Sequence, residues 1–145
     1  MTTVFDVNAG KLIDKTKDSL KSVDALKPTE WIKFAKTKAT ADKPPEDDDF
    51  WYTRAAAIMR TLYINGKPTG VERLRVKYGG RKDTGSKPSR FVKGTGNLIR
   101  KILQQLESAG LVKKTEISGK KGRILTKKGK SYLDKIAASL AKEEK

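Results

Sequence analysis

The longest hydrophobic pattern in the chain covers residues 51–64, which lie between an acidic run and the turn signal Asn65-Gly66. At about 100° per residue, the spacing of an α-helix, the polar side chains of this stretch share a sector only about 120° wide. They are Thr53, Arg54, Arg60 and Thr61. A helix that is apolar around most of its circumference is buried by its neighbours. The pattern therefore predicts a central helix with two arginines in a narrow polar window.

The carboxylates at residues 46–49 stand directly before that helix. Because the backbone N–H groups and the helix dipole favour negative charge at an N-terminus, such a run is typical of a helix start. A magnesium site is the alternative, but hard cations take oxygen ligands that converge from separate parts of a chain. We favour the helix start.

Two further helices are predicted in the N-terminal part of the chain. The first begins at Asp6-Val7-Asn8, and its apolar side recurs at helical spacing. That side consists of Leu12, Ile13, Thr16, Leu20 and Val23. The second and shorter helix begins near Pro28, a residue suited to a first helical turn. Its apolar face consists of Trp31, Ile32, Phe34 and Ala35. The prolines at positions 44 and 45 then prevent helix.

A short third helix is predicted after the turn at residues 65–70, with Thr69 as its N-cap. One face of this helix is apolar, with Val71, Leu74 and Tyr78. The other face leaves three cations for solvent or a ligand, namely Arg73, Arg75 and Lys77. Gly79-Gly80 is predicted to end the helix in a left-handed C-cap.

Residues 80–95 show no hydrophobic period and are predicted to form a flexible loop. Glycine, serine and proline alternate there with cations, a composition suited to wrapping phosphates. The candidate contact residues are Arg81, Lys82, Lys87, Ser89, Arg90 and Lys93. A plain surface connection, pinned to the core by Phe91, is the simpler interpretation, and the two are compatible.

The clearest supersecondary pattern lies in residues 95–142. An amphipathic helix, capped by Thr95 or Asn97, ends at Gly110. Its polar face consists of Asn97, Arg100, Lys101, Gln104, Gln105 and Ser108. Strands at residues 111–117 and 123–126 flank a glycine-containing turn, which predicts a hairpin. Thr126 then caps a last helix, and residues 142–145 are expected to fray. The apolar stripe of this helix consists of Tyr132, Leu133, Ile136, Ala137 and Leu140.

The order helix, short helix, amphipathic helix, hairpin is that of a winged helix-turn-helix. We predict a mostly α fold with a small β-hairpin: a winged-helix-like domain around a central helix, with extra N-terminal helices. The chain is expected to form a single domain over residues 1–145. Residues 1–45 are its N-terminal helical elaboration, and residues 46–142 form the core with the wing hairpin 111–126. Residues 97–108 would be the recognition helix. The wing tip would offer Lys120, Lys121 and Arg123.

Charge points to the class of partner. The formal net charge is +16, and it is divided unevenly. Residues 1–50 hold nine lysines and ten carboxylates, a net of −1, whereas residues 51–145 hold 24 basic and seven acidic residues, a net of +17. A field this one-sided favours a polyanion, most often nucleic acid. Every arginine lies after residue 50, which favours recognition over a merely well-solvated lysine-rich surface.

Composition also excludes several classes of function. The chain has no cysteine and no histidine, so it lacks thiolate chemistry, the commonest general base and the commonest metal ligand. Carboxylates in the basic region stand singly, so we predict no enzyme, no metal and no cofactor. No apolar run approaches the roughly 20 residues of a membrane span. We expect an intracellular protein without a secretory signal.

Short motifs along most of the chain resemble the S19e family of small-subunit ribosomal proteins of archaea and eukaryotes. The most specific are Trp51-Tyr52-Thr53-Arg54-Ala55-Ala56 and Tyr78-Gly79-Gly80-Arg81. Trp31 after Pro28-Thr29-Glu30 also fits, as do Pro88-Ser89-Arg90-Phe91, Arg100-Lys101-Ile102-Leu103-Gln104 and Gly122-Arg123 followed by Leu125-Thr126. Residues 83–86 depart from the family pattern, so no contacts are carried over to them.

The resemblance implies a structural constituent of the small ribosomal subunit that binds rRNA in the head and is required for subunit maturation and pre-rRNA processing. By position, it assigns RNA contact to Arg54, Arg60, Arg81, Arg90, Arg100 and Lys101. The implied partners are small-subunit rRNA, its precursor and neighbouring ribosomal proteins. The protein would be cytoplasmic, ribosome-associated and a monomer outside the ribosome.

Topology alone leaves a second function open. A winged helix is equally typical of a DNA-binding transcriptional regulator or a chromatin protein. A-form RNA has a deep and narrow major groove, so on RNA the same surfaces would meet phosphates, 2′-hydroxyls and irregular junctions. Binding to rRNA fragments and to duplex DNA at equal salt would separate the two functions.

Overall fold

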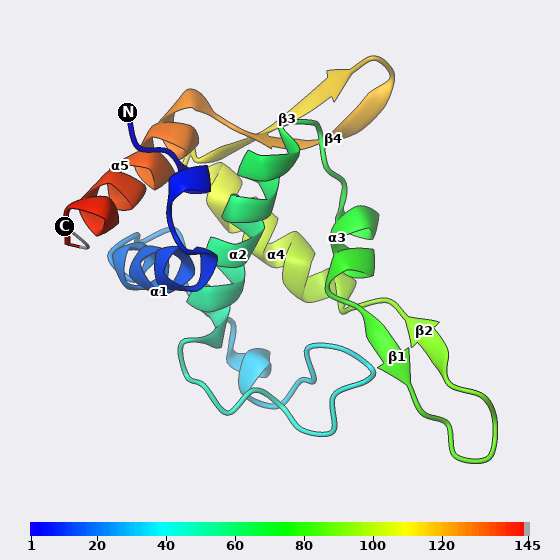
Figure 1. The fold of residues 1–145 in the computed structure, drawn as a ribbon. Helices are drawn as coiled ribbons and strands as arrows, with labels where there is room; N and C mark the ends of the chain where they lie inside the picture. The colour runs from blue at the N-terminus through cyan, green and yellow to red at the C-terminus, as the bar shows by residue number, and fades with distance from the viewer. Residues whose placement is uncertain (144–145) are drawn as a thin grey trace.

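The structure is a computed structural model and describes residues 1–143 (Figure 1). Within that range the chain forms helices α1 Ala9–Leu20, α2 Phe50–Asn65, α3 Val71–Lys77, α4 Gly96–Ser108 and α5 Lys127–Glu143. Two antiparallel hairpins pair β1 Gly80–Lys82 with β2 Arg90–Val92 and β3 Val112–Ile117 with β4 Lys120–Leu125. Single 3₁₀ turns occur at Val4–Asp6 and Glu30–Lys33. This architecture confirms the predicted mostly α, winged-helix-like fold.

Helix α2 is the central helix that the sequence predicts. It lies in the middle of the fold, surrounded by the other helices (Figure 1). Trp51, Ala55, Ile58, Met59 and Leu62 on it are all at most 1% exposed. The helix ends at Gly66, whose φ of 59° is left-handed, a conformation that glycine adopts without steric cost.

The acidic run stands directly before α2, as predicted, although the side chain of its N-cap residue makes no capping hydrogen bond. Asp49 is the N-cap residue, and Asp47 accepts a hydrogen bond from the Asp49 backbone N–H at 3.0 Å. The Asp49 carboxylate itself pairs with Lys21 of the N-terminal segment at 2.5 Å. Among residues 1–143 no group of three or more acidic side chains is arranged as a metal site.

Helix α1 confirms the first predicted N-terminal helix, with Asn8 accepting hydrogen bonds from the N–H groups of Gly10 and Lys11. The second predicted helix is wrong. Only a 3₁₀ turn forms at Glu30–Lys33, and Phe34, expected on the buried face, is 82% exposed. So short a helix gains little from its own hydrogen bonds, and this segment is held by tertiary contacts: Trp31 meets the Trp51 ring edge-on at 6.2 Å.

Helix α3 forms as predicted, but both of its ends differ. Its N-cap is Gly70 and not Thr69, because Thr69 exchanges backbone hydrogen bonds of 3.0 Å with Arg123 of β4. Its C-cap residue Tyr78 has a φ of −96°, and neither glycine that follows is left-handed. Gly79 is required for a different reason. A Cβ there would lie 2.5 Å from the Val92 carbonyl oxygen.

The prediction of a loop over residues 80–95 is wrong in part, because β1 and β2 form a hairpin there. Its ladder has only three residue pairs, from Gly80 opposite Val92 to Lys82 opposite Arg90. All its strand residues are exposed or half-buried, so no apolar alternation marks it in the sequence. The connecting residues 83–89 project away from the body of the protein (Figure 1).

The region from α4 to α5 confirms the predicted order. Thr95 is the N-cap residue of α4, and Gly110, with a φ of 75°, follows its end. Strands β3 and β4 are joined by Ser118 and Gly119, both with positive φ, so β4 begins three residues earlier than expected. Thr126 caps α5 by accepting a 3.1 Å hydrogen bond from the Gly129 N–H.

The apolar stripe of α5 is buried at Leu133, Ile136, Ala137 and Leu140, as predicted. Of the residues expected to fray, 142 and 143 are helical, and 144–145 lie outside the described residues. One apolar cluster joins α1 and the 3₁₀ segment to α2, α4 and α5. Across residues 1–143, no helix has the length and apolar character needed to cross a membrane.

Candidate nucleic-acid interface

Helix α4 has the division of faces that a recognition helix requires. Leu98, Ile99, Ile102, Leu103 and Leu106 are at most 3% exposed and bind the helix to the core. The opposite face is exposed to solvent, and it consists of Asn97, Arg100, Lys101, Gln104 and Ser108. The predicted contacts Arg100, Lys101 and Gln104 are therefore displayed together.

Gln105 lies on the edge of the polar face and is used internally. Its side-chain oxygen accepts a 2.8 Å hydrogen bond from the Trp51 indole N–H, and its amide nitrogen donates to the Lys27 carbonyl at 2.8 Å. The N-terminal segment is thereby fixed along one flank of α4. The binding face of α4 is narrower than the polar stripe in its sequence.

The wing lies beside the C-terminal half of α4. Glu107 of the helix accepts a hydrogen bond from Arg123 Nε of β4 at 3.3 Å and lies 3.9 Å from Lys114 of β3. The Arg123 side chain is only 14% exposed, so its guanidinium joins the wing to the helix. Lys120 and Lys121 extend into solvent, and Lys121 is 4.0 Å from Glu116.

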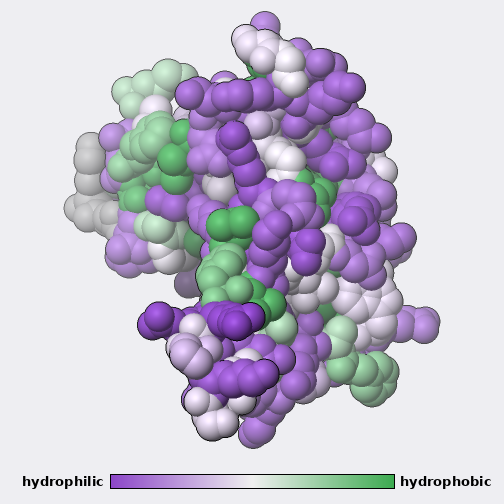
Figure 2. All heavy atoms as spheres, turned by 90° about the vertical axis from the view of Figure 1, so that its right-hand side faces the viewer, coloured by the Kyte–Doolittle hydropathy of each residue, from purple (hydrophilic) through white to green (hydrophobic). Residues whose placement is uncertain are grey.

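The β1–β2 hairpin displays a second set of cations. Four of its predicted contact residues are exposed: Arg81, Lys82, Lys87 and Arg90. Ser89 is half-buried. Lys93, beyond the end of β2, donates to Glu72 of α3 at 2.8 Å. Viewed from the side of α3 and both hairpins, the surface is hydrophilic over most of its area (Figure 2).

The three RNA contacts predicted on α3 differ in their exposure and in their hydrogen bonds. Arg73 is exposed. Arg75 donates from Nε to the Gly94 carbonyl at 2.9 Å and from Nη1 to Glu72 at 2.7 Å, so it positions the end of the hairpin. The hydrogen bonds from Lys93 and Arg75 lower the pKa of Glu72 to about 2.

Arg54 of the central helix is largely enclosed. Its guanidinium lies over the Tyr78 ring at 4.1 Å and the Phe50 ring at 5.1 Å. Burial lowers its pKa from the usual value, although an arginine keeps its charge in proteins. Two aromatic faces therefore stabilise the cation, and Arg54 links α2 to the end of α3.

Arg60 and Lys77 form a cationic pair between α2 and α3. Lys77 donates to the Thr61 hydroxyl at 2.7 Å, and burial, together with the charge of Arg60, lowers the Lys77 pKa. The Arg60 Nε is buried and has no hydrogen-bond acceptor within residues 1–143. No carboxylate of the described chain pairs with either cation. An anionic oxygen at this position would accept from Arg60 and relieve the repulsion.

Some exposed cations were not selected from the sequence. Among them are Lys113 on β3 and Lys127, Lys128 and Lys130 at the start of α5. The consecutive lysines after Thr126 lie on the predicted last helix and not on the recognition helix or wing, so the winged-helix pattern does not select them.

These features define a class: a small, basic, mostly α protein of winged-helix type, with exposed cations on the polar face of α4 and on two hairpins. The family model of ribosomal protein S19e matches residues 3–143. A small ribosomal subunit protein eS19 from Aeropyrum pernix is 44% identical over 144 residues, covering 99% of this chain and 92% of that protein. The chain belongs to the ribosomal protein S19e family.

Further relatives come from archaea and eukaryotes. The eS19 proteins of Thermoplasma volcanium and Emericella nidulans are each 40% identical, over 99% and 98% of this chain and 92% and 94% of their own length. Membership confirms the resemblance recognised in the sequence and the prediction of a structural ribosomal protein. It also confirms that the protein is not an enzyme and is ribosome-associated in the cytoplasm.

Proposed function

We propose that this protein is a structural constituent of the small ribosomal subunit, which binds rRNA in the head and its precursor and is required for subunit maturation. The observation that carries the proposal is the exposed face of α4, where Arg100 and Lys101 have no ionic partner within residues 1–143. Family membership favours this function over a DNA-binding regulator.

In the proposed mechanism, exposed cations displace condensed counterions from rRNA phosphates, and affinity falls as salt rises. The face of α4 and the hairpin tips would follow the shape and backbone of an RNA junction, because bases in A-form helices are difficult to reach. If six to ten phosphates are engaged, raising salt from about 50 to about 200 mM weakens binding about 10³–10⁵-fold. The acceptor missing at Arg60 Nε would be one phosphate oxygen, which would also lie near the Lys77 ammonium.

The test is the double substitution Arg100→Glu and Lys101→Glu. Both side chains are exposed, so the variant is expected to fold but to be lost from pre-ribosomal particles and small subunits in sedimentation gradients. The matched control is Lys127→Glu with Lys128→Glu on α5, which makes the same change of charge outside the proposed face. Normal co-sedimentation of the α4 variant would overturn the proposal.

A second experiment separates RNA from DNA. The purified protein is titrated with small-subunit rRNA fragments and with random duplex DNA at equal salt. We expect the rRNA fragments to bind more tightly. Preference for duplex DNA would favour the regulator instead. Gel filtration of the free protein tests the proposal that it is a monomer outside the ribosome.

A further inference from the structure

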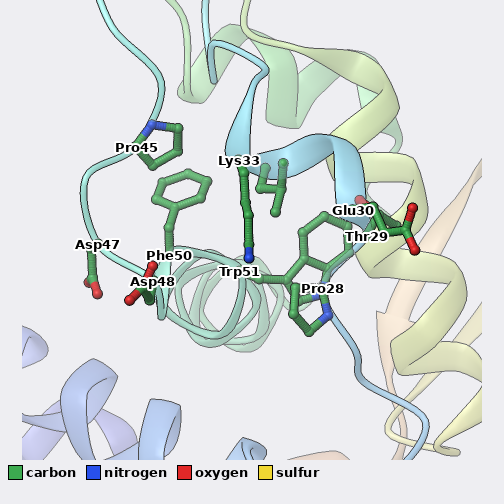
Figure 3. Close-up of a pocket in the computed structure, with 10 residues that line it drawn as sticks. Pro28, Thr29, Glu30, Lys33, Pro45, Asp47, Asp48, Phe50 and Trp51 are labelled. Atoms are coloured by element: carbon green, nitrogen blue, oxygen red, sulfur yellow. The ribbon is translucent and has the colours of Figure 1, made fainter.

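A pocket of about 610 Å³ opens between the 3₁₀ turn Glu30–Lys33 and the start of α2 (Figure 3). This volume is typical of ligand pockets. It lies in the N-terminal part of the chain, and of the predicted rRNA contacts Arg54 lies against its Phe50 wall. Its lining residues are Pro28, Thr29, Glu30, Ile32, Lys33, Pro45, Asp47, Asp48, Phe50 and Trp51.

The walls of the pocket are built from rings. Pro45 lies over the Phe50 ring on one side, and Trp51 lies next to Pro28 on the other (Figure 3). Trp51 is fixed by its hydrogen bond to Gln105, and Phe50 is backed by the guanidinium of Arg54. Rigid aromatic and proline walls suit the alkyl stem of a long side chain or a flat guanidinium.

The charge of the pocket is opposite to that of the rest of the protein. Glu30, Asp47 and Asp48 give it three carboxylates, and Lys33 gives one ammonium group, a net of −2 in a chain of +16. Glu30 and Asp48 are exposed and make no ion pair within residues 1–143. By contrast, the adjacent Asp49 is already paired with Lys21.

Lys33 shows which kind of group fits between these walls. Its side chain extends from the 3₁₀ segment towards the start of α2 and lies between Phe50 and Trp51 (Figure 3). Its stem is therefore flanked by the rings, and the carboxylates lie to either side, Asp47 and Asp48 beyond Phe50 and Glu30 beyond Trp51 (Figure 3). The residue is exposed, so the chain can rotate out of the pocket and yield its place to another cation.

We propose that this pocket receives a lysine or arginine side chain from an extended basic segment of a neighbouring protein. Phosphates are repelled by the carboxylates, so the occupant is protein and not RNA. Proteins that bind rRNA are rich in such cations, so basic segments are available wherever this protein assembles. The identity of the neighbour as a ribosomal protein rests on the proposed function, whereas the chemistry of the pocket does not.

The direct test is titration of the free, ¹⁵N-labelled protein with hexa-arginine peptide, followed by NMR. A protein of net charge +16 repels this probe elsewhere. We expect localised shift changes in residues 28–33 and 45–51, including the indole N–H of Trp51. Shift changes spread over other surfaces, or no binding at all, would overturn the proposal.

Substitutions in the pocket are expected to change the affinity for the peptide in opposite directions. Glu30→Lys with Asp48→Lys should weaken peptide binding at least about tenfold, equivalent to about 1.4 kcal/mol. The matched control, Asp14→Lys with Asp24→Lys, changes exposed carboxylates outside the pocket and should retain binding. Lys33→Ala removes the internal competitor and should strengthen binding. Equal affinities for wild type and the pocket variant, or weaker binding by Lys33→Ala, would contradict the proposal.

A final experiment uses purified small subunits. Carbodiimide links carboxylates to lysine amines in direct contact, so Glu30 or Asp48 should be linked to a lysine of another protein. Two outcomes would overturn docking. One is that Glu30 and Asp48 react with glycine ethyl ester as readily in the subunit as in the free protein, and the other is rRNA crosslinked to residues 28–33. Loss of rRNA binding by the α4 variant does not affect the peptide titration, so the two proposals fail separately.

Discussion

The two β-hairpins are similar in charge but differ in how they are attached. The β3–β4 hairpin pairs six residues on each strand, and its base is buried at Val112 and Leu125. The β1–β2 hairpin pairs three residues on each strand and carries a connection, residues 83–89, that is exposed except at Ser89. The first is a preorganised surface, whereas the second can adapt its tip to a partner.

The attachment of the wing gives the largest predicted effect. A Cβ at Gly122 would lie 2.7 Å from the Thr69 nitrogen and 2.9 Å from the Pro68 carbonyl carbon. Gly122→Val should therefore separate β4 from the turn before α3 and lower the free energy of unfolding by about 1–3 kcal/mol. The measurement is denaturant unfolding.

The control for this change is Ser86→Val in the exposed tip of the other hairpin. It is expected to remain within about 0.5 kcal/mol of wild type, as surface changes usually do. Equal losses for the two variants would remove the distinction between a fixed and an adaptable hairpin.

Substitutions in the tip of the β1–β2 hairpin are expected to change RNA binding and not the stability of the fold. Lys82→Ala, Lys87→Ala and Arg90→Ala together should leave the thermal midpoint unchanged. If each side chain meets one phosphate, the slope of log affinity against log salt should fall by about 2–3. The triple variant Lys127→Ala, Lys128→Ala and Lys130→Ala is the control, and it should retain the slope.

The cations of the wing should fall into two groups, one that affects stability and one that affects RNA binding. Arg123→Ala removes the hydrogen bond to Glu107 and should cost about 0.5–1 kcal/mol of stability while retaining the salt slope. Lys120→Ala with Lys121→Ala should have the opposite pattern, with a slope lower by about 1–2 and unchanged stability. A change of slope for Arg123→Ala would show that this arginine also reaches RNA.

The smallest effect concerns the base of the β1–β2 hairpin. Glu72 has a pKa lowered to about 2 by Lys93 and Arg75, so in the folded protein it stays ionised at a pH where the unfolded chain binds a proton. Its contribution is present above about pH 4.5 and is lost as pH falls towards 2. Thermal midpoints of wild type and Glu72→Gln should converge over that range. A constant difference would exclude this linkage.

The sequence predicts elements where burial imposes a period. The apolar faces of α2, α4 and α5 reach the core, so each leaves a pattern that can be read. The β1–β2 hairpin has no buried face, and its pairing depends on the close approach of Gly79 to Val92, which no local pattern encodes. The same applies to Trp31, whose edge-on contact with the Trp51 ring holds the segment where a helix was expected.

The candidate site follows the same rule. Exposure of Arg100 and Lys101 follows from the period of α4. The internal use of Arg75, Gln105 and Arg123 does not, because their partners Gly94, Trp51 and Glu107 lie on other elements. The sequence does not distinguish a cation that stabilises the fold from one that is free to bind a ligand. Tertiary partners separate them.

The burial of α2 also has a consequence during synthesis of the chain. The helix is complete at Asn65, but Gln105 of α4 and the apolar stripe of α5 are needed to cover it. At about 5–20 residues per second, α5 is synthesised roughly 4–16 s after α2. During that interval α1, which is made before α2, can cover one side of it, and the side that packs on α4 and α5 stays uncovered. We expect truncation before α5 to leave that apolar side exposed and the chain prone to aggregation.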